Sequence, residues 1–148
     1  MTIDTFLNKH IADWNVLHMK LRHYHWNVTG EQFFTLHTKF EELYNEAAVH
    51  VDELAERLLA LGSRPVSTMT GYLELASVRE AAGNESAAEM VQAVAEDYTR
   101  MIAELKQGME TAVSAGDETT GDLLLGIRTS LDKQVWMMNA FLGKDSLA

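Results

Sequence analysis

Two histidines and three carboxylates in the first half of the chain have the types and spacing of metal ligands. His25 and His37 stand on either side of a short turn at residues 27–30, and the carboxylates follow His37 on one stretch. They are Glu41, Asp52 and Glu56. Imidazole and carboxylate ligands together favour Fe(II), with Mn(II), Zn(II) and Co(II) as competitors. A thiolate site is excluded because the chain contains no Cys.

His37 and the three carboxylates share one face of a helix predicted over residues 32–61. At about 100° per residue, the carboxylates fall about 40°, 60° and 100° from His37. The apolar stripe, which runs from Phe33 to Leu61, lies mostly between about −120° and −60°. The candidate ligands therefore point away from the core of their own subunit. Ala48 and Leu59 share the ligand face, and this mixture indicates an interface rather than open solvent.

One chain cannot bring all of these residues to a single ion. His37 and Glu56 are 19 residues apart in sequence, which is about 28 Å of helix. The pairs His37/Glu56 and Glu41/Asp52 are both symmetric about the point between residues 46 and 47. Two copies of the helix, packed antiparallel about a two-fold axis there, would join the two halves of each site. His25 would join His37 because the turn between their helices is short.

Two other interpretations stay open. The carboxylates can be the solvated face of a helix in an acidic protein, with His25 and His37 as hydrogen-bonded histidines in a helix interface. A di-iron site inside one bundle would need a Glu-x-x-His motif from each of two helices. The sequence has no such motif, since Glu46 and His50 are four residues apart. A site within one subunit is therefore the weaker hypothesis.

Long helices are the elements that must position these residues. Apolar residues recur with helical period over long stretches, and no stretch alternates with the period of a strand. The predicted helices cover about residues 3–27, 32–61, 70–77, 86–115 and 119–142. Gly62 and Pro65 end the second, Ser86 opens the fourth with a capping box, and Gly116 ends it. We expect an all-α fold in one domain over residues 1–148: a four-helix bundle with a long crossover that carries a short helix between helices two and three.

Composition excludes several classes of protein. With 148 residues, 47% of them hydrophobic, the chain can fill the core of one domain. No apolar run approaches the ~20 residues that span a bilayer, and the first residues show no signal peptide, so we expect a cytoplasmic protein without membrane contact. The 22 Asp and Glu against 12 Lys and Arg give a net charge of −10, which disfavours binding to nucleic acid.

Three segments around the candidate ligands resemble the Dps family, the mini-ferritins. They are HWNVTG at residues 25–30, FFTLHTKFE at 33–41 and HVDELAER at 50–57, and the likeness extends through residues 72–74, 116–117 and 131–136. The resemblance implies a ferritin-like bundle that assembles into a hollow homododecamer. It also implies a ferroxidase that oxidises Fe(II) at two-fold interfaces, often with hydrogen peroxide in preference to oxygen, and stores the ferric mineral inside.

Carried over by motif, the resemblance gives the site two halves. His25, His37 and Glu41 would come from one subunit, and Asp52 and Glu56 from its partner. Family members commonly have Asp where this chain has Glu41, so this residue departs from the pattern.

The resemblance also suggests residues outside the ligand set. Trp26 is similar to a near-site tryptophan that intercepts radicals, with interface packing as the alternative. Asp117 and Asp122 resemble acidic residues that line iron-entry pores, although Gly126 stands where a further acid would be expected. Helix capping is an equally simple role for Asp117.

Direct DNA binding is not expected. Family members that bind DNA usually carry a terminal tail rich in Lys and Arg, whereas this chain has one Lys before His10 and one, Lys144, near its C-terminus. Protection of DNA would then be chemical, through removal of iron and peroxide. The rival hypotheses are a nucleoid-binding protein without enzymatic activity, and a structural oligomer whose site is vestigial or holds Zn(II).

Overall fold

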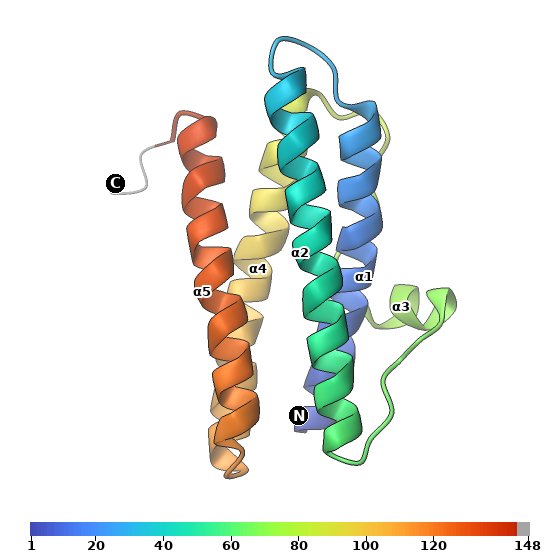
Figure 1. Cartoon of the computed structure of the whole chain (residues 1–148), viewed down its shortest axis with the longest axis vertical. Helices are drawn as coiled ribbons and strands as arrows, with labels where there is room; N and C mark the ends of the chain where they lie inside the picture. The colour runs from blue at the N-terminus through green and yellow to red at the C-terminus, as the bar shows by residue number, and fades with distance from the viewer. Residues whose placement is uncertain (145–148) are drawn as a thin grey trace. The chain divides into compact units, whose positions relative to one another are not determined.

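The chain folds into helices, as the sequence predicts. The computed structural model describes residues 1–144, which contain no strand. The helices are α1 (Ile3–Asn27), α2 (Phe33–Ala60), α3 (Met69–Leu75), α4 (Ala87–Ser114) and α5 (Glu118–Phe141) (Figure 1). Each lies within one or two residues of its predicted range, because helical periodicity and the Gly and Pro residues mark the ends well. Among the described residues, none of these helices is both long and apolar enough to cross a membrane.

Contacts divide the chain into two compact units, Met1–Ala87 and the part from Ala88 onward. In the first unit, α1 and α2 lie side by side and antiparallel (Figure 1). Most of the predicted apolar stripe of α2 is buried: Leu36, Phe40, Leu43, Ala47, Leu54 and Leu58. Its two end members are not, since Phe33 is half-buried at the first position of the helix and Leu61, at the C-cap, is 38% exposed. The turn between the two helices is tight because Gly30 adopts a φ of 106°, a left-handed conformation that Gly reaches without a steric penalty. This turn sets the ends of α1 and α2 next to each other.

Polar side chains of α1 hold the long crossover that carries α3. Buried Asp13 accepts hydrogen bonds from the backbone N–H groups of Ser77 (2.6 Å) and Val78 (3.0 Å), just after α3. Asn8 accepts one from the N–H of Val66 at 2.7 Å, before α3. These bonds satisfy backbone donors that have no partner in a helix. The crossover is therefore tied to α1 on both sides of its short helix.

A third tie joins the end of the crossover to α1. The buried Tyr24 hydroxyl donates to the Glu85 carboxylate at 2.5 Å, and the N–H groups of Ala82 and Gly83 donate to the same carboxylate. Burial raises the pKa of Glu85, but the hydrogen bonds from Tyr24 and the backbone outweigh it and lower the pKa to about 2. The ionised carboxylate thus fixes the loop that precedes α4 by hydrogen bonds to Tyr24 and to the loop's own backbone.

In the second unit, α4 and α5 form a hairpin. Gly116 has a φ of 71° at the turn, and Asp117 caps α5 by accepting a hydrogen bond from the N–H of Thr120 at 3.0 Å. The capping role considered for Asp117 is therefore present, while Asp122 is an exposed residue of the first turns of α5. The pore-lining role of both residues stays a prediction. Residues 145–148, part of the C-terminal tail weighed above for DNA contact, lie outside the described residues.

Candidate metal site

His25 and His37 meet where α1 ends and α2 begins. Their rings stack with centroids 3.8 Å apart and planes 12° from parallel. His25 Nδ1 bonds to the carbonyl oxygen of His37 at 2.6 Å, and His37 Nδ1 bonds to the carbonyl oxygen of His25 at 2.7 Å. The proximity predicted from the short turn is therefore confirmed, and the reciprocal pair of bonds fixes both rings.

These two bonds determine which ring nitrogen is available to a metal. A carbonyl oxygen only accepts hydrogen bonds, so Nδ1 of each ring must carry the proton. In the neutral imidazole the lone pair then lies on Nε2. A backbone carbonyl that receives the Nδ1–H group is the usual outer partner of a metal-ligating histidine, because it fixes the tautomer and orients the ring. Both His25 and His37 have this arrangement.

The end of α1 explains why the sequence produces this geometry. The last four carbonyls of a helix have no partner inside it, and the carbonyl of His25 is among them. The carbonyl of Tyr24 accepts the N–H of Val28, which closes the helix, while the His37 side chain satisfies that of His25. The histidine of α2 therefore caps α1, and the pair is part of the connection between the helices.

Glu41 and Tyr44 complete this end of the unit. Glu41 is exposed one turn beyond His37 on α2, and the Tyr44 hydroxyl donates to its carboxylate at 3.3 Å. The Tyr44 ring also stands edge-on to His25, with centroids 5.4 Å apart. Residue type and spacing of metal ligands do not single out Tyr44, because a tyrosine is not among the candidate ligand types. The signal that could have found it is the three-residue spacing from Glu41, which places the two side chains on neighbouring positions of one helix.

Asp52 and Glu56 lie at the other end of α2. Both are exposed, and they are about 22 Å and 28 Å along the helix from His37. Among residues 1–144, no group of three or more His, Asp or Glu side chains is placed to hold a metal ion. The chain alone thus presents His25, His37 and Glu41 at one end and two further carboxylates far from them. The share of Asp52 and Glu56 in a site with the histidines therefore stays a prediction.

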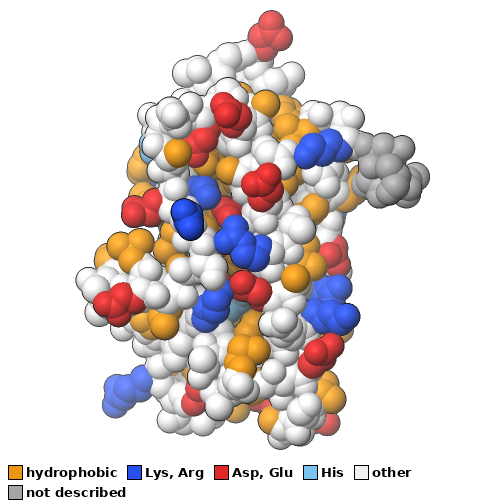
Figure 2. Space-filling view, turned by 180° about the vertical axis from the view of Figure 1, so that it is seen from behind, with side chains coloured by type: hydrophobic (Ala, Val, Ile, Leu, Met, Phe, Trp, Pro, Cys, Tyr) orange, Lys and Arg blue, Asp and Glu red, His pale blue; other side chains and the backbone are white. Residues whose placement is uncertain are grey.

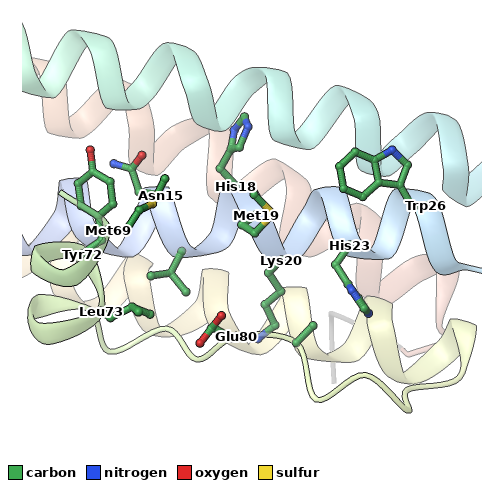
Figure 3. A pocket seen from close by; sticks show the side chains of 12 residues that line it. Asn15, His18, Met19, Lys20, His23, Trp26, Met69, Tyr72, Leu73 and Glu80 are labelled. Atoms are coloured by element: carbon green, nitrogen blue, oxygen red, sulfur yellow. The ribbon is translucent and has the colours of Figure 1, made fainter. Parts of the chain in front are cut away.

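Trp26 follows His25 at the end of α1. It lines a groove of about 410 Å³ between α1 and the crossover with α3, together with Met19, Met69 and Leu73 (Figure 3). The indole is 61% exposed, and the other three side chains are 53–75% exposed. Apolar side chains gathered in this way are typical of a surface that another molecule covers. The packing role of Trp26 and its role toward radicals both stay predictions.

A second histidine pair joins α1 and α2 nearer the other end of the unit. His10 and His50 are 1% and 8% exposed, and both contact the buried Trp14. Trp14 Nε1 donates to His10 Nε2 at 3.0 Å. Burial, then the charges of His50 and Lys9, lower the pKa of His10 to about 3. This pair is therefore part of the core.

Comparison with known proteins identifies the family. The model of the ferritin-like domain matches residues 5–148. "DNA protection during starvation protein 2" of Bacillus anthracis is 58% identical over 138 residues, which cover 93% of this chain and 94% of that protein.

Solved structures agree with this match. Dps from Listeria innocua, in a structure soaked with cobalt, is 39% identical and superposes with a TM-score of 0.96, covering 100% of this chain and 96% of that one. Two substituted forms of the same protein have a single His replaced by Gly, at positions 12 residues apart. His25 and His37 have the same separation.

A further structure connects the fold with a class of metal sites. Dps from Vibrio cholerae, described as a member of a broad superfamily of ferritin-like diiron-carboxylate proteins, is 36% identical and has a TM-score of 0.92, with 95% of this chain and 88% of that one covered. These likenesses confirm the predicted fold class, a ferritin-like four-helix bundle with a short helix in the crossover. The chain belongs to the Dps family of ferritin-like proteins.

Proposed function

We propose that this protein oxidises Fe(II) at sites shared between two subunits and stores the ferric product inside a homododecameric cage. The observation that carries the proposal is the histidine pair, in which both Nδ1 groups are bound to carbonyls and both Nε2 atoms are left for a metal. Membership of the ferritin-like family supports iron as the substrate, since a relative is described as a diiron-carboxylate protein.

In the proposed site, His25, His37 and Glu41 of one subunit bind Fe(II) together with Asp52 and Glu56 of the partner subunit. The carboxylates offset the positive charge that accumulates as two irons bind side by side. Paired oxidation then balances as two Fe(II), one hydrogen peroxide and two protons giving two Fe(III) and two water molecules. Because peroxide takes both electrons at once, no hydroxyl radical is released. Hydrogen peroxide as the preferred oxidant, with oxygen as the alternative, rests on the family resemblance.

The outer face of α2 supports a two-fold dimer. Ala48, at the centre of the helix, is exposed, and the larger apolar residues Val49 and Leu59 are 54% and 56% exposed. Small and apolar residues on an uncovered face favour close approach of a second helix. An isologous contact there would create two identical sites at once.

Other parts of the chain have proposed roles in the assembled cage. Asp117 and Asp122 would line the pores through which Fe(II) enters, and Trp26 would intercept radicals that escape the paired reaction. Zn(II), Mn(II) or Co(II) would compete for the iron site, as their ligand preferences imply. One domain over residues 1–148 and a location in the cytoplasm are part of the same proposal.

Protection of DNA would follow from this chemistry rather than from contact. The net charge is −10, and acidic and basic side chains are interspersed on the face shown in Figure 2. Strong binding to the phosphate backbone needs clustered positive charge. We expect no gel shift of DNA at about micromolar protein, neutral pH and moderate salt, and a shifted band would favour the nucleoid-binding alternative.

Iron retention tests the proposal. Fe(II) is added with limiting peroxide, the sample is passed through gel filtration, and iron is counted per assembled particle. Hundreds of irons that elute with a cage-sized peak would support storage, as expected for a mineral rather than for bound ions. A few irons on an intact particle would instead favour zinc binding or a structural role.

A matched pair of variants then tests the site. Asp52→Ala is expected to abolish rapid Fe(II) oxidation and to leave the assembly intact, whereas Glu53→Ala, an exposed carboxylate that points away from the ligand face, is expected to keep the wild-type rate. Wild-type oxidation by Asp52→Ala would overturn the proposed ligand set.

A further inference from the structure

Tyr44 contacts two of the candidate ligands, one through its ring and one through its hydroxyl. Its ring stands edge-on to His25, with centroids 5.4 Å apart and planes 82° to each other. Its hydroxyl donates to Glu41 Oε1 at 3.3 Å. One buried side chain therefore touches a candidate ligand from α1 and another from α2.

Two residues of α1 hold Tyr44 in turn. The guanidinium of Arg22 lies over the ring, 4.3 Å from its centroid, a cation–π contact that favours a fixed ring position. His18 packs against the same ring at 5.6 Å and accepts a hydrogen bond from Arg22 Nε at 2.8 Å. Burial, and next the charge of Arg22, lower the pKa of His18, while a hydrogen bond to the Tyr44 backbone opposes this. The neutral ring is the form that can accept from Arg22.

The hydroxyl of Tyr44 restricts a side chain that would otherwise be mobile. Glu41 is exposed, and a free glutamate loses substantial rotamer entropy when a metal fixes it. A hydrogen bond to one carboxylate oxygen reduces that loss in advance and leaves the other oxygen for a metal. Outer partners of this kind typically change metal affinity about 10- to 100-fold.

We infer that Tyr44 is a positioning residue of the metal site, whose hydroxyl orients Glu41 as a ligand and whose ring buttresses His25. This inference rests on the proposed function, because it assumes that the site binds a divalent metal. It assigns Glu41 a share in that binding although the residue departs from the family's usual Asp.

Co(II) is a suitable probe because it binds the same ligand types as Fe(II) and stays divalent in buffer without peroxide. Its visible absorption also reports the ligands and their geometry. The assembled protein is titrated with Co(II) under anaerobic conditions. Tyr44→Phe keeps the ring and removes the hydroxyl, and it is expected to weaken Co(II) about tenfold and to change the visible spectrum. Tyr72→Phe on α3 removes a hydroxyl from the same unit and is expected to match the wild type.

A double substitution separates positioning from general loosening. Glu41→Gln alone is expected to weaken Co(II) by a similar factor, and Tyr44→Phe added to it should have no further effect, because coupled residues are not additive. Tyr44→Leu, which also removes the ring beside His25, should weaken Co(II) further even in the Glu41→Gln background.

Each result decides something. Unchanged affinity and spectrum in Tyr44→Phe, or additive losses in the double variant, would overturn the hydroxyl's role. Equal affinity of Tyr44→Leu and Tyr44→Phe would overturn the role of the ring. A wild-type assembly that binds no Co(II) would overturn the proposed metal site itself. This result is distinguishable from the loss of a role for Tyr44, which requires that the wild type bind Co(II).

Discussion

The first unit contains two histidine pairs that join the same two helices and differ in what their nitrogens do. At the turn, His25 and His37 both direct Nδ1–H at a backbone carbonyl. Toward the other end of the helices, Nδ1 of His10 and Nδ1 of His50 are buried without a hydrogen-bond partner, and His50 Nε2 lies 3.4 Å from the Glu46 carboxylate without hydrogen-bond geometry. In His25 and His37, the outer pair, each Nδ1 is bound and each Nε2 is left for a ligand. In His10 and His50, the inner pair, both rings are packed against Trp14.

This difference shows that proximity of two imidazoles does not make a metal site. A ligand needs a fixed tautomer with a lone pair directed to a place where an ion and further donors can enter. The pair at the turn has carboxylate Glu41 on its helix face. The deeper pair has one nearby carboxylate, Glu46, 3.4 Å from His50, and a pKa of His10 lowered to about 3, which shows how strongly its surroundings disfavour charge.

Removal of the outer pair should have the largest effect on activity. In the double variant His25→Ala/His37→Ala, rapid Fe(II) oxidation is expected to disappear, because each assembled site loses both imidazole ligands. Stopped-flow absorbance of the ferric product measures the rate. The inner pair supplies the control, since His50→Gln should oxidise iron at the wild-type rate. Rapid oxidation that survives in the double variant would place the reaction elsewhere.

Truncation within the inner pair should instead reduce stability. His10→Ala leaves the Trp14 N–H without its acceptor and opens a cavity in the core, at an expected cost of about 2–4 kcal/mol. Urea unfolding at one fixed protein concentration measures this cost, because assembly makes apparent stability depend on concentration. Below the transition the variant should still oxidise iron. A loss of oxidation with unchanged stability would reverse the roles assigned to the two pairs.

The helices of this fold could be predicted from the sequence, whereas the hydrogen bonds that tie the crossover to α1 could not. The helical period of the apolar residues predicted every helix, because Gly62, Pro65 and Gly116 interrupt otherwise continuous patterns. The ties between α1 and the crossover were not predicted. Asp13 reads as an ordinary helix carboxylate, and only the path of the chain shows that it receives the N–H groups of Ser77 and Val78.

The candidate site was predictable to the same partial degree. Spacing across the short turn correctly brought His25 to His37, since few residues separate the two helix ends. The carbonyl partners of the rings depend on which backbone groups the end of α1 leaves unpaired, and Tyr44 depends on a contact across helices. Neither follows from periodicity. The share of Asp52 and Glu56 stays a prediction, because it requires a second subunit.

The inner pair should also make stability depend on pH. The pKa of His10 is lowered to about 3 in the folded chain by burial, then by His50 and Lys9, while unfolded His takes a proton near 6.5. Between these values the unfolded chain binds the proton and the folded chain does not, so stability falls as pH falls from about 6.5 toward 3. The loss is at most about 1.4 kcal/mol per pH unit.

Comparison with His10→Gln isolates this dependence from the titration of carboxylates. Glutamine can still accept from Trp14 Nε1 but does not titrate. The melting temperature of the wild type should fall more than that of the variant between pH 7 and pH 4.5. Parallel curves would mean that His10 is protonated in the folded chain, against the contrast drawn between the pairs.

The smallest effect is expected from a substitution at Tyr24, next to His25 in sequence. It tests whether metal binding depends only on residues that contact the ligands. Tyr24 precedes His25, yet its hydroxyl reaches the crossover and donates to Glu85. Tyr24→Phe should lower stability by about 1 kcal/mol or less, since Glu85 is only half-buried and solvent screens the bond. It should leave Co(II) affinity unchanged, in contrast to Tyr44→Phe. Both tyrosines are buried, but it is the Tyr44 hydroxyl that donates to Glu41, so a loss of Co(II) binding in Tyr24→Phe would show that the histidine pair responds to the packing of the whole helix end rather than to Tyr44.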